Sequence, residues 1–220
     1  MAEKYGTIPK RFTKEWFDYV WTYYKWHIMG PIFVIIFVIV TAYQCTHKAQ
    51  YDINITYAGG KIFSDAQVEM IESEAANYAD DVNGDGKVLV NFQQINFSNT
   101  AGSEETDYNL QMKLDLQLQT KSSYLYIWDK DETDLMLARD AIDRVYVPVE
   151  DWAQSDVSDR LYSVDGGTAY AVYIGESESV KALGINTDDL YLVLMQNNTG
   201  EASDEEYANY IKFANYLIGE

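Results

Sequence analysis

The stretch that decides how this chain is read is IMGPIFVIIFVIVTAYQC, residues 28–45. No residue between His27 and His47 carries a formal charge, and the apolar run 32–40 would cover every side of a helix instead of one stripe. As a helix, residues 26–43 would rise roughly 27 Å, close to the thickness of a bilayer core, which is about 30 Å. The stretch therefore predicts a membrane-spanning helix.

The residues expected to anchor this helix are aromatic at its ends and apolar along its length. Aromatic side chains crowd residues 16–26 and return at residue 43, as in the belts that lie at headgroup level. Gly30-Pro31 is expected in the first turns of the span, where a missing amide is best tolerated. The predicted anchor residues are Trp21, Trp26, Pro31, Phe33, Ile36, Phe37, Val40 and Tyr43.

Three other readings of the stretch compete with an anchor. In a cleaved signal peptide, Val40-Thr41-Ala42 would be a passable cleavage site, but 27 residues rich in aromatics precede the apolar run, which is long for a signal sequence. A lipoprotein would use Cys45, yet Gln44 stands where a small residue is expected. A buried segment of a soluble core is the third alternative. An uncleaved anchor fits best.

The charges around the span predict its orientation. Five basic residues precede it against three acidic ones, and beyond it only Lys48 is close. By the positive-inside rule the N-terminus is cytoplasmic. We therefore expect a cell-membrane protein with a cytoplasmic or juxtamembrane aromatic helix (1–27), a transmembrane helix (28–45) and an extracytoplasmic α/β domain (46–220).

The composition of the outer domain excludes several functions. Residues 46–220 contain 11 Lys or Arg and 32 Asp or Glu, a net charge of −21, against +2 for residues 1–45. Electrostatics therefore disfavours nucleic acid and anionic lipid as partners. Beyond His47 there is no histidine or cysteine, which removes Ser-His-Asp and Cys-His catalysis and ordinary zinc sites there. Enzymes that use a pair of carboxylates, such as glycosidases, remain compatible with this composition, but no specific feature supports one. We therefore expect that the protein is not an enzyme.

Strand-like and helix-like segments alternate along the outer domain. Expected strands cover 51–57, 87–97, 123–128, 168–174 and 190–196; expected helices cover 64–79, 105–120, 131–144, 178–183 and 204–218. Ser64 and Gln67 form a capping box at one helix start. The alternation predicts a three-layer α/β domain with a mostly parallel sheet. Ligands of such sheets gather beyond the carboxyl ends of the strands, here at Gly59-Gly60 and Asp129-Lys130. Trp128 is a further candidate, because aromatic side chains can stack on sugars, with packing in the core or at its rim as the alternative.

The segment DVNGDGKV, residues 81–88, resembles the start of a calcium loop. Asp81, Asn83 and Asp85 stand at positions one, three and five, and Gly86 at position six. Position twelve should be a bidentate Glu, and here it is Phe92. The alternatives are a partial calcium site at Asp81, Asn83 and Asp85, or an Asx-rich turn between a helix and a strand with no cofactor.

The segment RLYSVDGGTAYAVYI, residues 160–174, is similar to a motif of the extracellular solute-binding proteins of bacterial ABC importers. In that family the chain returns to its first lobe through a segment that Tyr162, Asp165, Gly166, Tyr170 and Val172 match, although Tyr173 replaces a proline. The resemblance extends weakly over residues 51–220. It implies a lobe of the periplasmic-binding-protein type, and it adds Gly166 and Gly167 to the candidate ligand-binding residues.

Solute-binding proteins hold ligand between two lobes, and this chain has room for one. A single lobe cannot close over a small solute, so burying most of the solute's surface would be difficult. We therefore expect a non-enzymatic, single-pass accessory or protein-interaction subunit, with a membrane protein or transporter as partner. The alternative is a membrane-tethered protein that binds a sugar, peptide or cation for a transporter.

Overall fold

The computed structural model describes residues 9–46, 50–98 and 100–219. The chain forms two compact units that divide between Ala49 and Gln50, and each is described by itself.

The first unit contains one helix, α1 (Lys14–Thr46), of 33 residues. It would extend over roughly 50 Å, so it is longer than a bilayer core is thick. It is long and apolar enough to cross a membrane, and none of its most apolar segment is buried. Because α1 begins at Lys14, Pro31 lies in the helix interior and not in its first turn, where a missing amide is best tolerated. A proline there removes the amide that would bond the carbonyl of His27.

The second unit is built on a six-stranded sheet with the order β2-β1-β3-β6-β5-β4. Strand β1, which lies between β2 and β3, is buried on both faces along almost its whole length. The strands are β1 (Ile53–Gly59), β2 (Val90–Asn96), β3 (Leu125–Trp128), β4 (Leu161–Tyr162), β5 (Ala171–Tyr173) and β6 (Tyr191–Leu194).

The α/β class is confirmed, but the expectation of a mostly parallel sheet is wrong, because the sheet is mixed. Strand β1 runs parallel to β2 and β3, while β3–β6, β6–β5 and β5–β4 are antiparallel. Parallel neighbours need a crossover of about a dozen residues or more, which α2 (Asp65–Tyr78) and α3 (Glu104–Gln119) supply. Only residues 163–170 join β4 to β5, so these two strands pair as a hairpin.

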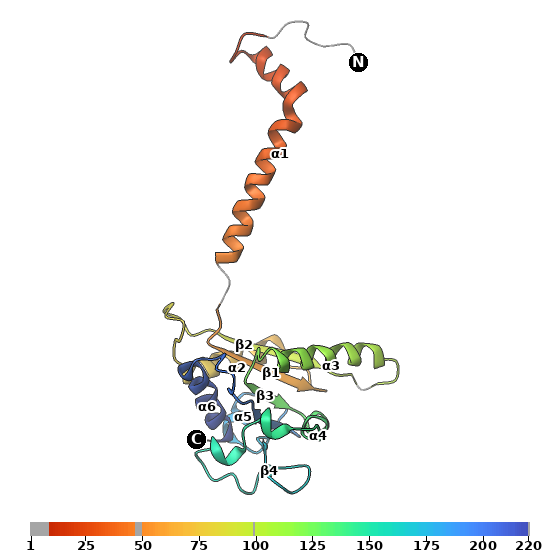
Figure 1. The fold of residues 1–220 in the computed structure, drawn as a ribbon, viewed down its shortest axis with the longest axis vertical. Coiled ribbons are helices and arrows are strands. Elements are labelled where there is room, and N and C mark those ends of the chain that lie inside the picture. The colour runs from red at the N-terminus through yellow and green to blue at the C-terminus, as the bar shows by residue number, and fades with distance from the viewer. Residues whose placement is uncertain (1–8, 47–49, 99, 220) are drawn as a thin grey trace. The chain divides into compact units, whose positions relative to one another are not determined.

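Helices cover both faces of the sheet (Figure 1). Neighbouring side chains of a strand point to opposite faces. Gln93 accepts a hydrogen bond from Gln117 of α3, whereas Gln94 bonds the backbone of Phe63, just before α2. Helix α4 (Lys130–Leu137) lies on the α3 side, where Gln111 of α3 donates to Glu132 of α4. On the other side, α2 packs with α6 (Asp204–Ile218), which also contacts α5 (Glu178–Ala182).

Local signals explain where helices begin and end. The capping box at Ser64 and Gln67 is confirmed, with each residue bonding the other's backbone amide. Helix α4 ends at Leu137 and does not reach the expected residue 144. Ala141 adopts a left-handed conformation with φ of 62°, which interrupts the helix before the 3-10 turns η1 (Ile142–Arg144) and η2 (Val149–Asp151).

Candidate functional site

The structure brings three of the predicted ligand-binding residues together where β1 and β3 end. The amide of Gly60 donates to Oδ2 of Asp129 over 2.6 Å, and the amide of Glu132 donates to Oδ1 over 3.1 Å. Asp129 thereby caps α4 and ties it to the end of β1. A Cβ atom on Gly59 would lie 2.4 Å from Oδ2 of Asp129, so only glycine fits there without rearrangement. A role of this junction in ligand binding stays a prediction.

A cavity of about 380 Å³ opens beside this junction. Acidic side chains dominate its wall, with none of the described lining residues basic, and Phe97, Tyr108 and Leu135 supply apolar surface. The acidic residues are Glu104, Asp107, Asp129, Asp131 and Glu132. A cavity with this charge favours cations and basic groups over anions.

Glu132 is the most perturbed carboxyl group of this cavity. It is buried, and its Oε1 accepts a hydrogen bond from Nε2 of Gln111 over 3.4 Å. Burial raises the pKa of Glu132 to about 7, with the nearby charge of Asp129 adding to the effect and the hydrogen bond from Gln111 opposing it. Glu132 is therefore partly protonated near neutral pH. No feature of the sequence indicated that Glu132 would lie on the buried side of α4.

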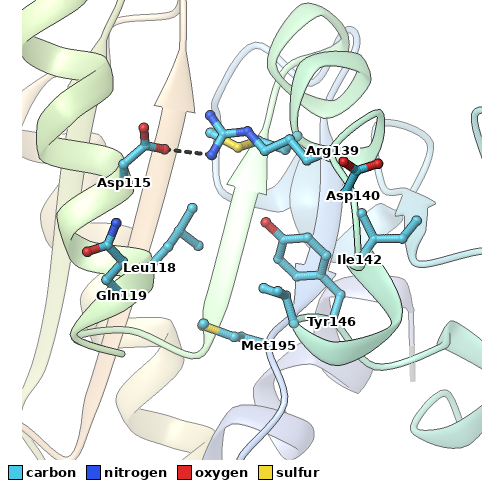
Figure 2. A pocket seen from close by; sticks show the side chains of 10 residues that line it. Asp115, Leu118, Gln119, Arg139, Asp140, Ile142, Tyr146 and Met195 are labelled. Atoms are coloured by element: carbon cyan, nitrogen blue, oxygen red, sulfur yellow. Dashed lines mark hydrogen bonds and ion pairs between the residues drawn. The ribbon is translucent and has the colours of Figure 1, made fainter.

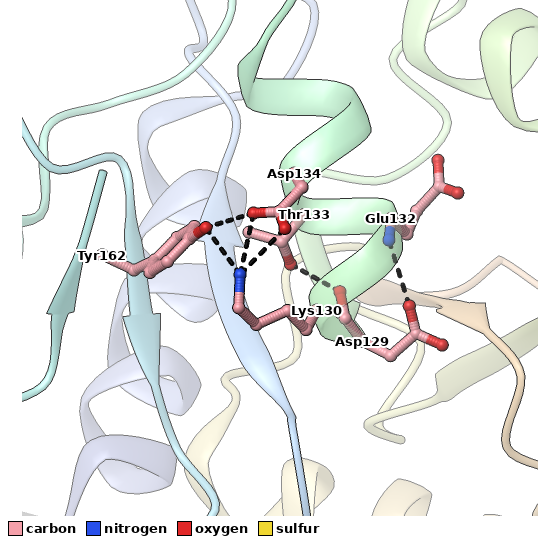
Figure 3. A network of polar contacts seen from close by, with 6 residues as sticks. All are labelled: Asp129, Lys130, Glu132, Thr133, Asp134 and Tyr162. Carbon is pink, nitrogen blue, oxygen red and sulfur yellow. Dashed lines mark hydrogen bonds and ion pairs between the residues drawn. The ribbon is translucent and has the colours of Figure 1, made fainter. Parts of the chain in front are cut away.

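A polar network joins α4 to the edge strand β4 (Figure 3). Nζ of Lys130 lies 2.8 Å from Oδ2 of Asp134 and 2.8 Å from the hydroxyl of Tyr162, which donates to the other oxygen of Asp134. The ammonium group also lies 4.5 Å from the centroid of the Tyr162 ring. The spacing of Lys130 and Asp134 was visible in the sequence, whereas the part played by Tyr162 appears only in the fold.

The network keeps both charged groups ionised. Hydrogen bonds from Lys130 to Asp134 and Tyr162 raise the pKa of Lys130. Burial opposes ionisation of Asp134, but hydrogen bonds from Lys130 and Tyr162 outweigh it and lower the pKa of that carboxyl. Because every polar group of the network has a partner within it, its geometry is that of a brace between α4 and β4.

The remaining predicted ligand-binding residues lie elsewhere. Trp128 is fully buried against Tyr126 and Tyr146, so it belongs to the core and presents no face to a ligand at the surface. Gly167 lines small cavities at the loop between β4 and β5, and Gly166 there has a left-handed φ of 68°. Neither glycine lines the acidic cavity at Gly59.

In the predicted calcium loop, the polar side chains bond the loop's own backbone. Asp81 accepts from the amides of Gly84 and Gly86 over 2.7 and 2.8 Å, and Asn83 and Asp85 each accept from an amide two residues on. Within the described ranges, no three His, Cys, Asp or Glu side chains are grouped to hold a metal. The geometry is that of an Asx-rich turn. A partial calcium site at Asp81, Asn83 and Asp85 stays a prediction.

Sequence reasoning missed the residue that organises this loop. Asp52 is buried and accepts from the amides of Val82 and Leu89 over 3.0 and 2.8 Å, and from Nδ2 of Asn83 over 3.2 Å. An acidic residue just before a strand gave no sign that it would be buried.

Comparisons of the chain with protein-family models, curated proteins and solved structures found no match. The class that the fold defines is an α/β domain with a mixed sheet, joined to one long apolar helix. Its function is therefore argued from its own geometry and charge.

Proposed function

We propose that this chain is a single-pass membrane protein whose acidic α/β domain lies outside the cytoplasm and serves as a non-enzymatic interaction subunit of a membrane complex. The observation that carries the proposal is the exposure of α1. Each of the nine consecutive apolar residues 32–40 is between 46% and 70% exposed. An apolar surface of this extent, present on all sides of a helix, is unstable in water and stable in lipid.

The charge distribution supports the proposed orientation. The basic residues that precede the span favour a cytoplasmic N-terminus, since translocating them costs free energy. The domain that follows has a net charge of −21 and carries its own core of buried residues. No family model matches the chain. The resemblance to solute-binding proteins therefore rests on residues 160–174 alone, and we keep it as part of this proposal.

The length of α1 supports a partner at the membrane. The helix exceeds a bilayer core by roughly 20 Å, and its N-terminal turns carry most of the aromatic residues. On a helix, Lys14, Asp18, Thr22 and Lys25 share one side, which leaves the aromatic side chains on the rest of the surface. Such a broad aromatic surface suits contact with another membrane protein at headgroup level.

The proposal is tested first by topology. In a Cys45→Ser background, a cysteine at Asp85 is expected to react with a membrane-impermeant maleimide in intact cells. A cysteine at Lys10, the matched control, is expected to react only after permeabilisation. The reverse pattern, or release of the chain from the membrane by high salt, would contradict a single-pass anchor with an outer domain.

The interaction role is tested by gentle extraction. We expect the chain to leave the membrane with a partner membrane protein, and expect substitution of the aromatic residues at 16–26 by leucine to reduce the amount of partner recovered. Leucine keeps the segment apolar and helical, so membrane insertion is retained in this variant. Recovery of the wild-type chain only as a lone monomer would refute the interaction role.

A second candidate function is a tethered ligand-binding protein for a transporter, favoured by the acidic cavity beside Gly59 and Asp129. Its negative charge predicts a cation or a basic peptide as ligand. Thermal denaturation of the full chain with calcium chloride, trilysine or glucose separates these classes. A saturable rise in melting temperature with trilysine or calcium alone would favour this role, and equal curves in all three would exclude it for these solutes.

A further inference from the structure

A second cavity, of about 320 Å³, lies between α3 and the segment that follows α4 (Figure 2). Its wall is mostly apolar and comes from parts of the chain far apart in sequence. The apolar side chains are Leu118, Met136, Ile142, Val145 and Met195. The acidic cavity at the sheet edge is a separate space, with no residue in common.

Tyr146 places a polar hydroxyl group in the mostly apolar wall of this cavity. It is only 3% exposed, yet its hydroxyl points into the cavity, below the ion pair of Asp115 and Arg139 (Figure 2). In the part of the chain that the structure describes, this hydroxyl has no hydrogen-bond partner. The hydroxyl is not among the buried side-chain atoms that lack a partner, so it is open to the cavity and accessible to a molecule there. Whatever occupies the cavity, water or a ligand group, can therefore bond this hydroxyl.

The ring of Tyr146 is held in place before any ligand arrives. It packs edge-on against Trp128 with ring centroids 5.5 Å apart. Its backbone pairs with Met195, and its carbonyl accepts from Nε2 of Gln196 over 2.8 Å. Burial raises the pKa of Tyr146, so the hydroxyl stays protonated and neutral over the physiological range. A preorganised group costs less entropy on binding.

The rim of the cavity selects against anions. Nη1 of Arg139 lies 2.7 Å from Oδ1 of Asp115, so the positive charge is already paired. Asp140 adds a second carboxylate, which leaves the lining with a net charge of −1. A cationic group at the mouth would therefore be attracted, and a carboxylate would be repelled.

The volume of the cavity and its methionine side chains indicate which ring system it can hold. A cavity of about 150 Å³ is enough for benzene, so roughly twice that volume suits a fused pair of rings. Met136 and Met195 supply flexible, polarisable side chains that pack well on aromatic faces.

We propose that this cavity is a binding site for a small aromatic amine, with its rings on the apolar wall, its polar group bonded to the hydroxyl of Tyr146, and its cationic end at Asp115 and Asp140. The site goes beyond the proposed membrane role and does not depend on it.

The probes that test the site share one ring system and differ in charge: tryptamine, indole and indole-3-acetate. Calorimetric titration of the full chain in lipid nanodiscs is expected to show saturable binding at one site, tightest for tryptamine and weakest for indole-3-acetate. Empty nanodiscs give the background from partition into lipid. Absence of saturable binding above that background for all three probes would overturn the proposal and leave water as the occupant.

Two variants locate the binding. Tyr146→Phe keeps the ring and removes the hydroxyl, so affinity for tryptamine is expected to fall about 2- to 10-fold. The matched control is Tyr126→Phe, because Tyr126 is a buried tyrosine whose hydroxyl is unbonded but which does not line the cavity. Equal losses in both variants, or none in either, would refute the role of Tyr146.

Two further variants test the shape and the charge of the cavity. Val145→Phe fills it from a partly exposed position and is expected to abolish binding while the melting temperature is retained. The double variant Asp115→Asn with Asp140→Asn turns the net charge of the lining from −1 to +1, and is expected to reverse the order of tryptamine and indole-3-acetate. Unchanged binding by both variants would show that the probes bind elsewhere and would overturn the proposal.

Discussion

The backbone amide of Gly60 lies 2.6 Å from Oδ2 of Asp129, and this contact joins the end of β1 to the start of α4. It brings two segments about seventy residues apart to the same edge of the sheet. The same carboxylate fills the space where a side chain of Gly59 would lie, so the junction depends on a missing Cβ atom as much as on a hydrogen bond.

Two neighbouring glycines therefore differ in what they tolerate. A Cβ atom at Gly59 would lie 2.4 Å from Oδ2 of Asp129, whereas one at Gly60 meets its nearest atom at 3.7 Å. We expect Gly59→Ala to lower the free energy of unfolding by about 1–3 kcal/mol through overpacking, and Gly60→Ala to change it by less than about 0.5 kcal/mol. Denaturant titration of the full chain in detergent measures both. Similar losses in the two variants would contradict the geometry.

Glu132 is expected to make stability depend on pH. Its pKa is about 7 in the folded protein, above its ordinary value near 4.5, because burial disfavours the charged form. The folded state thus holds the proton more tightly than the unfolded state. The stabilisation from Glu132 is complete below about pH 4.5 and is lost as the pH rises through 7.

The measurement is the difference in unfolding free energy between wild type and Glu132→Gln from pH 4 to 8. The variant lacks this titration, so we expect it to gain about 2–3 kcal/mol relative to wild type across that interval. Asp131→Asn, which removes an exposed carboxylate from the same helix turn, is the control. A constant difference between wild type and Glu132→Gln would remove Glu132 as a source of pH dependence.

Asp52 is expected to be the residue on which the loop before β2 depends. Its carboxylate accepts from three backbone amides, those of Val82, Asn83 and Leu89, and from the side chain of Asn83, while being almost fully buried. Asp52→Ala would leave these donors unpaired, at a cost of about 3 kcal/mol or more. Asp85→Ala removes an exposed carboxylate whose one hydrogen bond among the described residues is to the amide of Lys87, and should cost less than about 1 kcal/mol. Urea denaturation ranks the two, and a larger loss for Asp85→Ala would refute this account.

The polar network between α4 and β4 is expected to contribute only modestly to the free energy of unfolding. The side chains of Lys130 and Asp134 are 41% and 44% exposed, and ion pairs of that exposure contribute about 0–1 kcal/mol. The hydroxyl of Tyr162 adds hydrogen bonds to both groups, so we expect Tyr162→Phe to cost about 0.5–1.5 kcal/mol.

A double-mutant cycle with Asp134→Asn separates the shared part of this energy. The coupling between Tyr162→Phe and Asp134→Asn should be measurably different from zero, because the two groups are bonded to each other. Additive losses would mean that the network contributes through separate contacts with solvent or with the backbone.

Local signals in the sequence were sufficient for much of the fold. The uncharged run 28–45 predicted a long apolar helix, the capping box at Ser64 predicted the start of α2, and the alternation of strand-like and helix-like segments predicted an α/β domain. These features depend on residues close to one another in the chain, so the sequence displays them directly. The same local evidence brought Gly59 and Asp129 forward as candidates at the ends of two strands.

The direction of strand pairing and the contents of each cavity were decided only by the tertiary structure. Strands of four residues or fewer, such as β5 and β6, pair according to the path of the connecting loops, and their residues carry no mark of parallel or antiparallel neighbours. Burial likewise depends on what packs above a residue. It makes Trp128 part of the core, gives Glu132 a raised pKa, and leaves the hydroxyl of Tyr146 facing an open cavity. Each of these properties comes from contacts between segments distant in sequence, which no local pattern specifies.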